Sequence, residues 1–170
     1  MKNLWAPWRI EYILGKEEKY DGCIFEAAEG NNYDRDMLVL YRNTLVVVLL
    51  NRFPYANGHL LLAPSRHVAD LEDLDQHEAS ELMEMLRTCT AILKKHLLPD
   101  GFNIGLNLGE TAGAGLAEHL HFHIVPRWDG DHNFMATTAG IRTIPEHITR
   151  TFDRLLEDFQ KITRTAAAYK

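Results

Sequence analysis

The stretch EHLHFHIVPRW, residues 118–128, sets histidines and large apolar residues in alternation. The three histidines stand two residues apart: His119, His121 and His123. Apolar residues follow each of them in turn: Leu120, Phe122 and Ile124. Because successive side chains of a β-strand point to opposite faces, this alternation predicts a strand over 119–125, ended by Pro126. The imidazoles would form a row on one face, and the apolar side chains would pack on the core.

Three interpretations of this row are open. The plainest is a polar strand face without chemistry. The second is a catalytic metal site, since a His-x-His strand can supply two ligands, although zinc takes about four and Cys23 is the only plausible thiolate. The third is a nucleophilic histidine. A neutral imidazole attacks phosphorus or an acyl carbon when an acceptor holds its other nitrogen, while the flanking histidines donate to oxygens on which charge develops.

The segment before the histidines favours the nucleophile. Residues 101–109, GFNIGLNLG, alternate apolar with small or polar side chains and predict a half-buried strand. The glycine-rich loop ETAGAGLA follows at 110–117, and its small side chains let backbone N–H groups approach a phosphate closely. Such a loop is weak evidence alone, but beside three histidines it indicates an anion site.

Further upstream, the chain has the pattern of a β-hairpin. Residues 44–51, TLVVVLLN, are a β-branched and leucine run typical of a buried strand. Turn residues follow in RFPYANG (52–58), and HLLLAP (59–64) returns as a second strand. The two strands are therefore expected to pair as a hairpin.

Two helices complete the expected elements. Residues 75–97 carry apolar residues at steps of three and four, and Asp75 and Glu78 have the spacing of a capping box. Residues 145–162 repeat the helical pattern. Hairpins beside a long helix indicate an α+β fold with an antiparallel sheet.

Composition narrows the class of protein. The chain has 170 residues, 46% of them hydrophobic and 25% charged, which suits one soluble domain over 1–170. The net charge of −6 argues against a nucleic-acid partner. No apolar run approaches the roughly 20 residues needed to span a membrane. The two cysteines, Cys23 and Cys89, favour a cytoplasmic protein with reduced thiols.

The heptad HLHFHIV (119–125) resembles the signature of the histidine triad (HIT) superfamily, in which histidines alternate with apolar residues. Residues 49–68 are similar to the hairpin that holds the nucleoside in that family, and residues 101–119 to the strand and loop that lead into the triad. LWAPWRIEYI (4–13) and PRWDGDHNFM (126–135) resemble the branch of bacterial diadenosine tetraphosphate phosphorylases and hydrolases.

The resemblance implies a HIT-like α+β fold, with an antiparallel sheet of about five strands, one long helix and a C-terminal helix. The core would span about 20–128, with the N-terminal segment and the C-terminal helix as extensions. It also implies a homodimer whose sheets join across the two-fold axis.

The resemblance assigns catalytic roles to five residues. His121 would be the nucleophile that becomes nucleotidylated, and His123 would contact the transferred phosphate. His119 would orient His121 through its backbone carbonyl. His59 would lie beside the triad and Asn107 near the scissile phosphate. Plainer alternatives stand beside these roles, since His59 could be a satisfied core histidine.

A second set would bind the nucleotide. Ile24 and Phe25 would pack against the base, and Asn51 would bind the ribose hydroxyls; the alternatives are a plain core pair and a simple strand end. Backbone N–H groups of the glycine-rich loop would neutralise charge on the phosphate oxygens, at Gly113, Gly115 and Leu116.

Two departures from the family pattern matter. Many HIT enzymes carry Gln, Ser or Thr where this chain has Gly115 and Leu116, so backbone N–H groups must replace side-chain donors to the leaving group. Some relatives hold a structural zinc with two cysteines and histidines, but here one cysteine remains, followed by a glutamate. The conceivable zinc ligands are Cys23, Glu26, His67 and His119. The expected reaction requires no protein-bound metal, although a divalent metal on the substrate's phosphates is compatible with it.

These residues predict an enzyme that cleaves dinucleoside polyphosphates at the α-phosphate through a covalent nucleotidyl-histidine. Two other classes are kept: an adenosine phosphoramidase, which breaks P–N bonds with the same histidine, and a nucleotide-binding sensor with little turnover. The sequence leaves the choice between water and phosphate as acceptor open.

Overall fold

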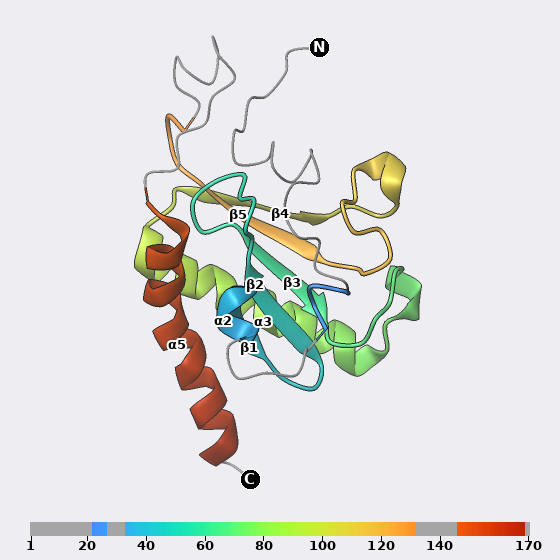
Figure 1. Ribbon diagram of the computed structural model, residues 1–170. Helices are drawn as coiled ribbons and strands as arrows, with labels where there is room; N and C mark the ends of the chain where they lie inside the picture. The colour runs from blue at the N-terminus through green and yellow to red at the C-terminus, as the bar shows by residue number, and fades with distance from the viewer. Residues whose placement is uncertain (1–21, 27–32, 132–145, 169–170) are drawn as a thin grey trace.

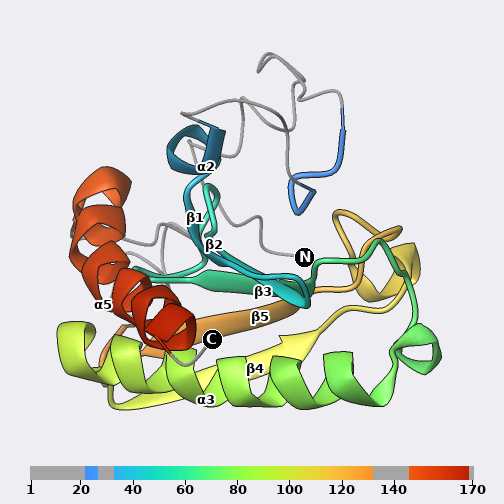
Figure 2. The ribbon, with the colours of Figure 1, turned by 90° about the horizontal axis from the view of Figure 1, so that it is seen from below.

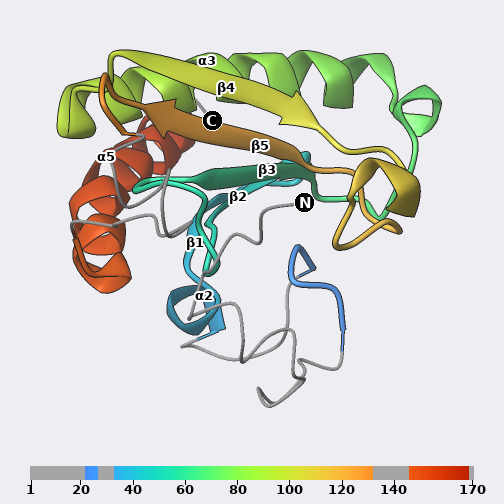
Figure 3. The ribbon, with the colours of Figure 1, turned by 90° about the horizontal axis from the view of Figure 1, so that it is seen from above.

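Five antiparallel strands form one sheet in the order β1-β2-β3-β5-β4, in a computed structural model that describes residues 22–26, 33–131 and 146–168 (Figures 1 and 3). The strands are β1 Val39–Arg42, β2 Val46–Leu50, β3 Leu60–Pro64, β4 Gly101–Leu106 and β5 Phe122–Arg127. The α+β class and the antiparallel sheet are thus confirmed. The residue pattern indicated four of these strands, and β1 is the one that it missed.

The β2–β3 hairpin is confirmed. Its register runs from Val46 opposite Pro64 to Leu50 opposite Leu60. Both strands are buried along their whole length, which is why an unbroken apolar run forms strands here.

The long helix is also confirmed, as α3 Gln76–Leu97. Its N-cap Asp75 accepts hydrogen bonds from the backbone N–H groups of His77 and Glu78, and the Glu78 side chain accepts from the N–H of Asp75, which completes the predicted capping box. The C-terminal helix, α5, runs Ile148–Ala168, beyond the predicted end at 162. Three short elements complete the described structure: α2 Tyr33–Asp36 and the 3₁₀ turns η1 Leu71–Asp73 and η2 Glu110–Ala112.

The sheet has two different faces (Figure 2). The helices α3 and α5 pack on one face and enclose the main core, to which Leu93, Ile124 and Phe159 contribute with no exposed surface. The other face carries a smaller apolar cluster, in which Phe25 packs with side chains of β1, β2 and β3. This second face is the one that receives the histidines.

Two boundaries differ from the prediction. β5 begins at Phe122, so His119 and His121 lie in the segment just before the strand, and β4 ends at Leu106 rather than at 109. Pro126 lies inside β5 and does not end it. β3 pairs only with the part of β5 up to Ile124, so at Pro126 the strand has a paired neighbour on one side, where a residue without an N–H is tolerated.

Some predictions lie outside the described residues, namely the family-like segment 4–13 and residues 132–135 of the second family-like segment. Within the part of the chain that the structure describes, no helix combines the length and the apolar character needed to cross a bilayer.

Candidate active site

The three histidines lie on the face of the sheet opposite the helices. His119 is fully buried, His121 is 7% exposed, and His123 is half-buried. The rings of His121 and His123 stand edge to face with centroids 5.0 Å apart. The predicted row of imidazoles on one face therefore forms, although two of its members precede the strand itself.

The backbone of His119 decides which nitrogen of His121 carries the proton. His121 Nδ1 lies 2.8 Å from the carbonyl oxygen of His119. A carbonyl can only accept, so Nδ1 carries a hydrogen, and in the neutral tautomer this places the lone pair on Nε2. Nε2 has no hydrogen-bond partner among the described residues. The His119 carbonyl thus holds the ring of His121 through Nδ1, which leaves Nε2 as the nitrogen that can attack an electrophile.

The ring of His119 is itself fixed at both nitrogens. Its Nε2–H donates to the carbonyl oxygen of Pro64 at 2.9 Å, so Nδ1 must accept. Cys23 Sγ lies 3.0 Å from that Nδ1. Burial raises the pKa of the Cys23 thiol and lowers that of His119, so both are neutral and the S–H donates to the ring. His119 is therefore structural through its side chain.

His123 is held by a second histidine. Its Nδ1 lies 3.0 Å from Nε2 of His59, which is fully buried. The other nitrogen of His59, Nδ1, faces the side-chain amide of Asn51 at 3.2 Å and the backbone N–H of Tyr55 at 3.1 Å. Desolvation lowers the pKa of His59 to about 3 and that of His123 to about 4. Both rings are consequently neutral at pH 7, and His59 lies beside the triad as expected.

The glycine-rich loop supplies fewer free donors than predicted. Gly113, in the left-handed region at φ 92°, donates its N–H to the carbonyl of Glu110 at 2.9 Å, so that N–H is not available for a phosphate. The N–H groups of Gly115 and Leu116 make no hydrogen bond to the described residues, so they retain the expected donor capacity. Asn107 donates to the carbonyl of Gly113 at 3.3 Å and so holds the loop.

Asn107 also lies at the level of the nucleophile. The β4–β5 ladder pairs Leu106 with Phe122, and one further step of the same register places Asn107 opposite His121. Its predicted position near the reacting centre is compatible with this register, while its observed hydrogen bond assigns it a loop-holding contact.

Ile24 and Phe25 differ in what they can do. Phe25 has no exposed surface, and its ring packs on those of His119 and His121 at 4.9 and 5.2 Å. In this arrangement Phe25 supports the triad, in line with the plain core alternative. Ile24 is half-buried and is the member of the pair with surface left for a base.

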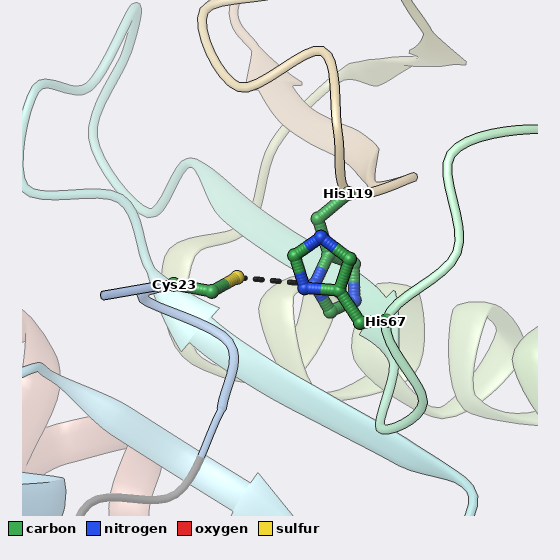
Figure 4. Close-up of side chains that lie close together, drawn as sticks. All are labelled: Cys23, His67 and His119. Atoms are coloured by element: carbon green, nitrogen blue, oxygen red, sulfur yellow. Dashed lines mark hydrogen bonds between the residues drawn. The ribbon is translucent and has the colours of Figure 1, made fainter.

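One group of side chains could hold a metal ion (Figure 4). Ligand atoms of Cys23, His67 and His119 lie within 4.8 Å of one another, and Glu26 Oε1 is 2.9 Å from Nδ1 of His67. A thiolate, two imidazoles and a carboxylate are ligand types that zinc takes, and Nδ1 of His119 already directs its lone pair toward Cys23 Sγ. The 3.0 Å between Cys23 and His119 is a hydrogen-bond distance, whereas tetrahedral zinc would hold S and N about 3.5 Å apart. These three residues and Glu26 would therefore bind zinc once Cys23 Sγ and His119 Nδ1 moved about 0.5 Å further apart.

Two functional contacts were not foreseen from the sequence. Tyr55 stacks on His59 with centroids 4.8 Å apart and supplies a backbone donor, and Pro64 supplies the acceptor for His119. The hydrogen bonds come from backbone atoms, which carry almost no sequence signal. The only available signal was their place at the two ends of the hairpin that holds His59.

The arrangement can attack an electrophile and stabilise the oxygens around it. It presents one bare imidazole nitrogen, a second neutral imidazole beside it and free N–H groups in the adjoining loop. These parts serve acyl or phosphoryl transfer through a covalent histidine intermediate.

Comparisons with known proteins point in the same direction. The HIT domain family model matches residues 33–130. The chain is 40% identical over 163 residues to the AP-4-A phosphorylase of Mycobacterium tuberculosis, covering 92% of this chain and 83% of that protein. It is 34% identical over 93 residues to the asymmetrical bis(5'-nucleosyl)-tetraphosphatase of Schizosaccharomyces pombe, covering 55% and 50%. A crystal structure of a Zn-bound histidine triad family protein from Mycobacterium smegmatis shares the fold, with a TM-score of 0.60 and 24% identity over 75% of this chain and 87% of that one.

Proposed function

Because the chain belongs to the HIT domain family, we propose that it is an enzyme that cleaves dinucleoside polyphosphates such as diadenosine tetraphosphate at the α-phosphate. The main support for the proposal is the hydrogen bond from Nδ1 of His121 to the His119 carbonyl, which leaves Nε2 of His121 available as the nucleophile. The similarity to the Mycobacterium tuberculosis phosphorylase over most of both chains supports the substrate class.

The reaction proceeds in two displacements. In the first, the lone pair of His121 Nε2 forms a bond to the α-phosphorus, and the bond from that phosphorus to the bridging oxygen breaks. The leaving polyphosphate keeps the bonding electrons. The nucleotide is now a phosphoramidate on an imidazolium, whose Nδ1–H remains on the His119 carbonyl. Splitting one difficult displacement into two is the gain from covalent catalysis.

In the second displacement, an oxygen of inorganic phosphate or of water attacks the same phosphorus. The N–P bond breaks, and its electrons return to Nε2. During both steps His123 and the N–H groups of Gly115 and Leu116 face the charged oxygens, where fixed donors lower the barrier. Phosphate is the acceptor that we propose, on the strength of the phosphorylase relative.

Product analysis with the full chain tests this proposal. Diadenosine tetraphosphate is supplied with and without inorganic phosphate, and the nucleotides are separated. We expect ATP and ADP in the presence of phosphate. ATP and AMP, or paired ADP, would show hydrolysis and overturn phosphate as the acceptor. An adenosine phosphoramidate assayed in parallel covers the other chemistry, since a strong preference for it would overturn the substrate class. Binding of AMP without any turnover would favour a sensor.

The site residues complete the proposal. Ile24 would contact the base, and the remaining hydrogen-bonding capacity of Asn51 would meet the ribose. The reaction needs no metal ligand from the protein, and a divalent metal would arrive on the substrate's phosphates. Zinc at Cys23, Glu26, His67 and His119 would be structural, because it would tie the 22–26 segment to the base of the triad.

We also propose a homodimer that joins through β4. This strand pairs only with β5 among the described strands, and Ile104 on it is 47% exposed. Pairing of two such edges would cover both their free backbone groups and this side chain. Light scattering should give twice the chain mass, and a monomer mass would contradict the proposal. The two cysteines, which form no disulfide, suit a reducing compartment such as the cytoplasm.

A further inference from the structure

A chain of hydrogen bonds runs from the β2–β3 loop to the triad, and the direction of each bond can be worked out. It begins at Asn51. The backbone N–H of Phe53 donates to Oδ1 of Asn51 at 2.9 Å, which identifies that atom as the acceptor. The atom that faces His59 at 3.2 Å is therefore Nδ2, which can only donate.

His59 Nδ1 consequently cannot carry a hydrogen. It receives the Nδ2–H of Asn51 and also the backbone N–H of Tyr55 at 3.1 Å. Two donors converge on one nitrogen, and stacking by Tyr55 at 4.8 Å holds the ring in place. The proton of neutral His59 must lie on Nε2.

The proton on His59 Nε2 in turn determines the tautomer of His123. His59 Nε2–H points at His123 Nδ1, 3.0 Å away, so Nδ1 of His123 accepts and its proton lies on Nε2. Nε2 of His123 has no hydrogen-bond partner among the described residues. Burial keeps both rings neutral at pH 7, so each ring carries a hydrogen on one nitrogen only.

Neighbouring imidazoles are thereby given opposite roles. His121 is held by an acceptor at Nδ1 and presents a bare Nε2, whereas His123 is held by a donor at Nδ1 and presents Nε2–H. One can attack phosphorus, and the other can only donate to a phosphate oxygen. The difference originates in the groups that bind the Nδ1 atoms, which are the His119 carbonyl for His121 and the His59 ring for His123.

We propose that Asn51, together with the backbone N–H of Tyr55, is a positioning element that sets the proton of His59 and through it makes His123 a hydrogen-bond donor to the transferred phosphate. This role rests on the proposed function and is distinct from ribose binding. Asn51 acts on His123 through His59, and its amide nitrogen is one of the two donors to His59 Nδ1, beside the Tyr55 N–H.

Two variants separate the roles. Asn51→Asp keeps an oxygen for the ribose but turns an acceptor toward His59 Nδ1. A charge-assisted bond to the carboxylate then draws the His59 proton to Nδ1, and His123 must follow by moving its own proton to Nδ1. Asn51→Ala removes the ribose contact but leaves the N–H of Tyr55 in place, so the original protonation pattern should persist.

The first readout is independent of turnover. In the full chain labelled with ¹⁵N-histidine, NMR at pH 8 reports which ring nitrogen of each histidine is protonated. We expect protonation at Nδ1 for His121 and at Nε2 for His59 and His123 in the wild-type chain and in Asn51→Ala. We expect it at Nδ1 for His123 in Asn51→Asp. A wild-type His123 protonated at Nδ1, or an unchanged His123 in Asn51→Asp, would overturn the inference. Because the wild-type spectrum alone can refute it, a variant that fails to fold does not leave it open.

The second readout is the split between kcat and KM. Loss of one donor to the developing charge costs about 100-fold in kcat, so Asn51→Asp should lose about that much with little change in KM. Asn51→Ala should mainly raise KM. The reverse order, with Asn51→Ala the slower enzyme, would assign Asn51 to the ribose alone. If no dinucleoside polyphosphate is turned over at all, the proposed function fails while the NMR pattern still decides this inference.

Discussion

Replacement of Cys23 by alanine should destabilise the protein by leaving a buried nitrogen without its donor. The ring of His119 has no exposed surface, and its Nδ1 receives the Cys23 thiol at 3.0 Å. A buried acceptor that loses its donor costs about 1–3 kcal/mol. The thiol is itself buried, and the packing lost with its sulfur adds about 0.8 kcal/mol on the scale of one methylene. We therefore expect Cys23→Ala to lower the free energy of unfolding by about 2–4 kcal/mol.

The matched control is Cys23→Ser, which restores a donor of similar size. It should stay within about 1 kcal/mol of the wild type, since a hydroxyl satisfies the same nitrogen. Urea unfolding followed by circular dichroism, in the presence of a chelator, gives the free energy of unfolding of all three proteins. An m-value that is the same in all three shows that the differences are differences in stability. For a chain of this length, about 2–4 kcal/mol corresponds to a melting temperature lower by about 4–16 °C.

Two results would show that the Cys23 thiol is not the hydrogen-bond donor to His119. If Cys23→Ala is as stable as the wild type, the thiol does not satisfy His119. If Cys23→Ser is as unstable as Cys23→Ala, and the wild type loses stability on chelation, the cysteine acts as a metal ligand and not as a hydrogen-bond donor.

Two further predictions concern the scaffold. Glu78→Gln keeps the cap on Asp75 but removes the charge that pairs with Arg66, and it should lower the melting temperature at pH 7 by about 2–4 °C. The Arg66 hydrogen bond holds the pKa of Glu78 below its ordinary value, so the stabilisation by the Glu78 charge is present above the unfolded pKa of about 4.3 and is lost as the pH falls through the folded pKa. The melting temperatures of the wild type and Glu78→Gln should therefore converge between pH 7 and pH 3. A difference in melting temperature that stays constant with pH would show that the Glu78 charge is not its cause. Gly58→Ala should cost at least about 2 kcal/mol, since φ is +72° and an added Cβ would lie 2.3 Å from Leu97 Cδ1. Gly130→Ala is its control, with φ of +74° and nothing within 4 Å, so equal losses in denaturant titrations would remove packing from the explanation.

The elements that could be predicted are those specified by local pattern. The apolar runs of β2 and β3, the turn between them and the capping box of α3 each lie within a short window of sequence, and each formed as expected. The histidine alternation also placed the three rings on one face. β1 was missed because Val39–Arg42 is four residues long, too short for a periodicity to stand out.

The chemistry of the site depended on contacts between distant residues. Cys23 and His119 are 96 positions apart, and His59 and His123 are 64 apart, so no local pattern signals either pair. The sequence neighbours of a histidine also do not indicate which of its ring nitrogens carries the proton. His121 and His123 occupy equivalent positions in the alternation, yet one meets a carbonyl and the other a ring N–H. The Phe25 ring shows the same limit, because only the packed structure reveals that it is buried beneath the triad.

Trapping the nucleotide on the enzyme tests whether His121 is the nucleophile. Wild-type protein is mixed with diadenosine tetraphosphate, quenched in alkali, where an acid-labile phosphoramidate survives, and digested for mass spectrometry. We expect an adenylyl group on the peptide that contains His121, attached to Nε2, and we expect none on His121→Asn, which should also show no turnover. An adenylyl group on another residue, or wild-type rates in His121→Asn, would show that His121 is not the nucleophile.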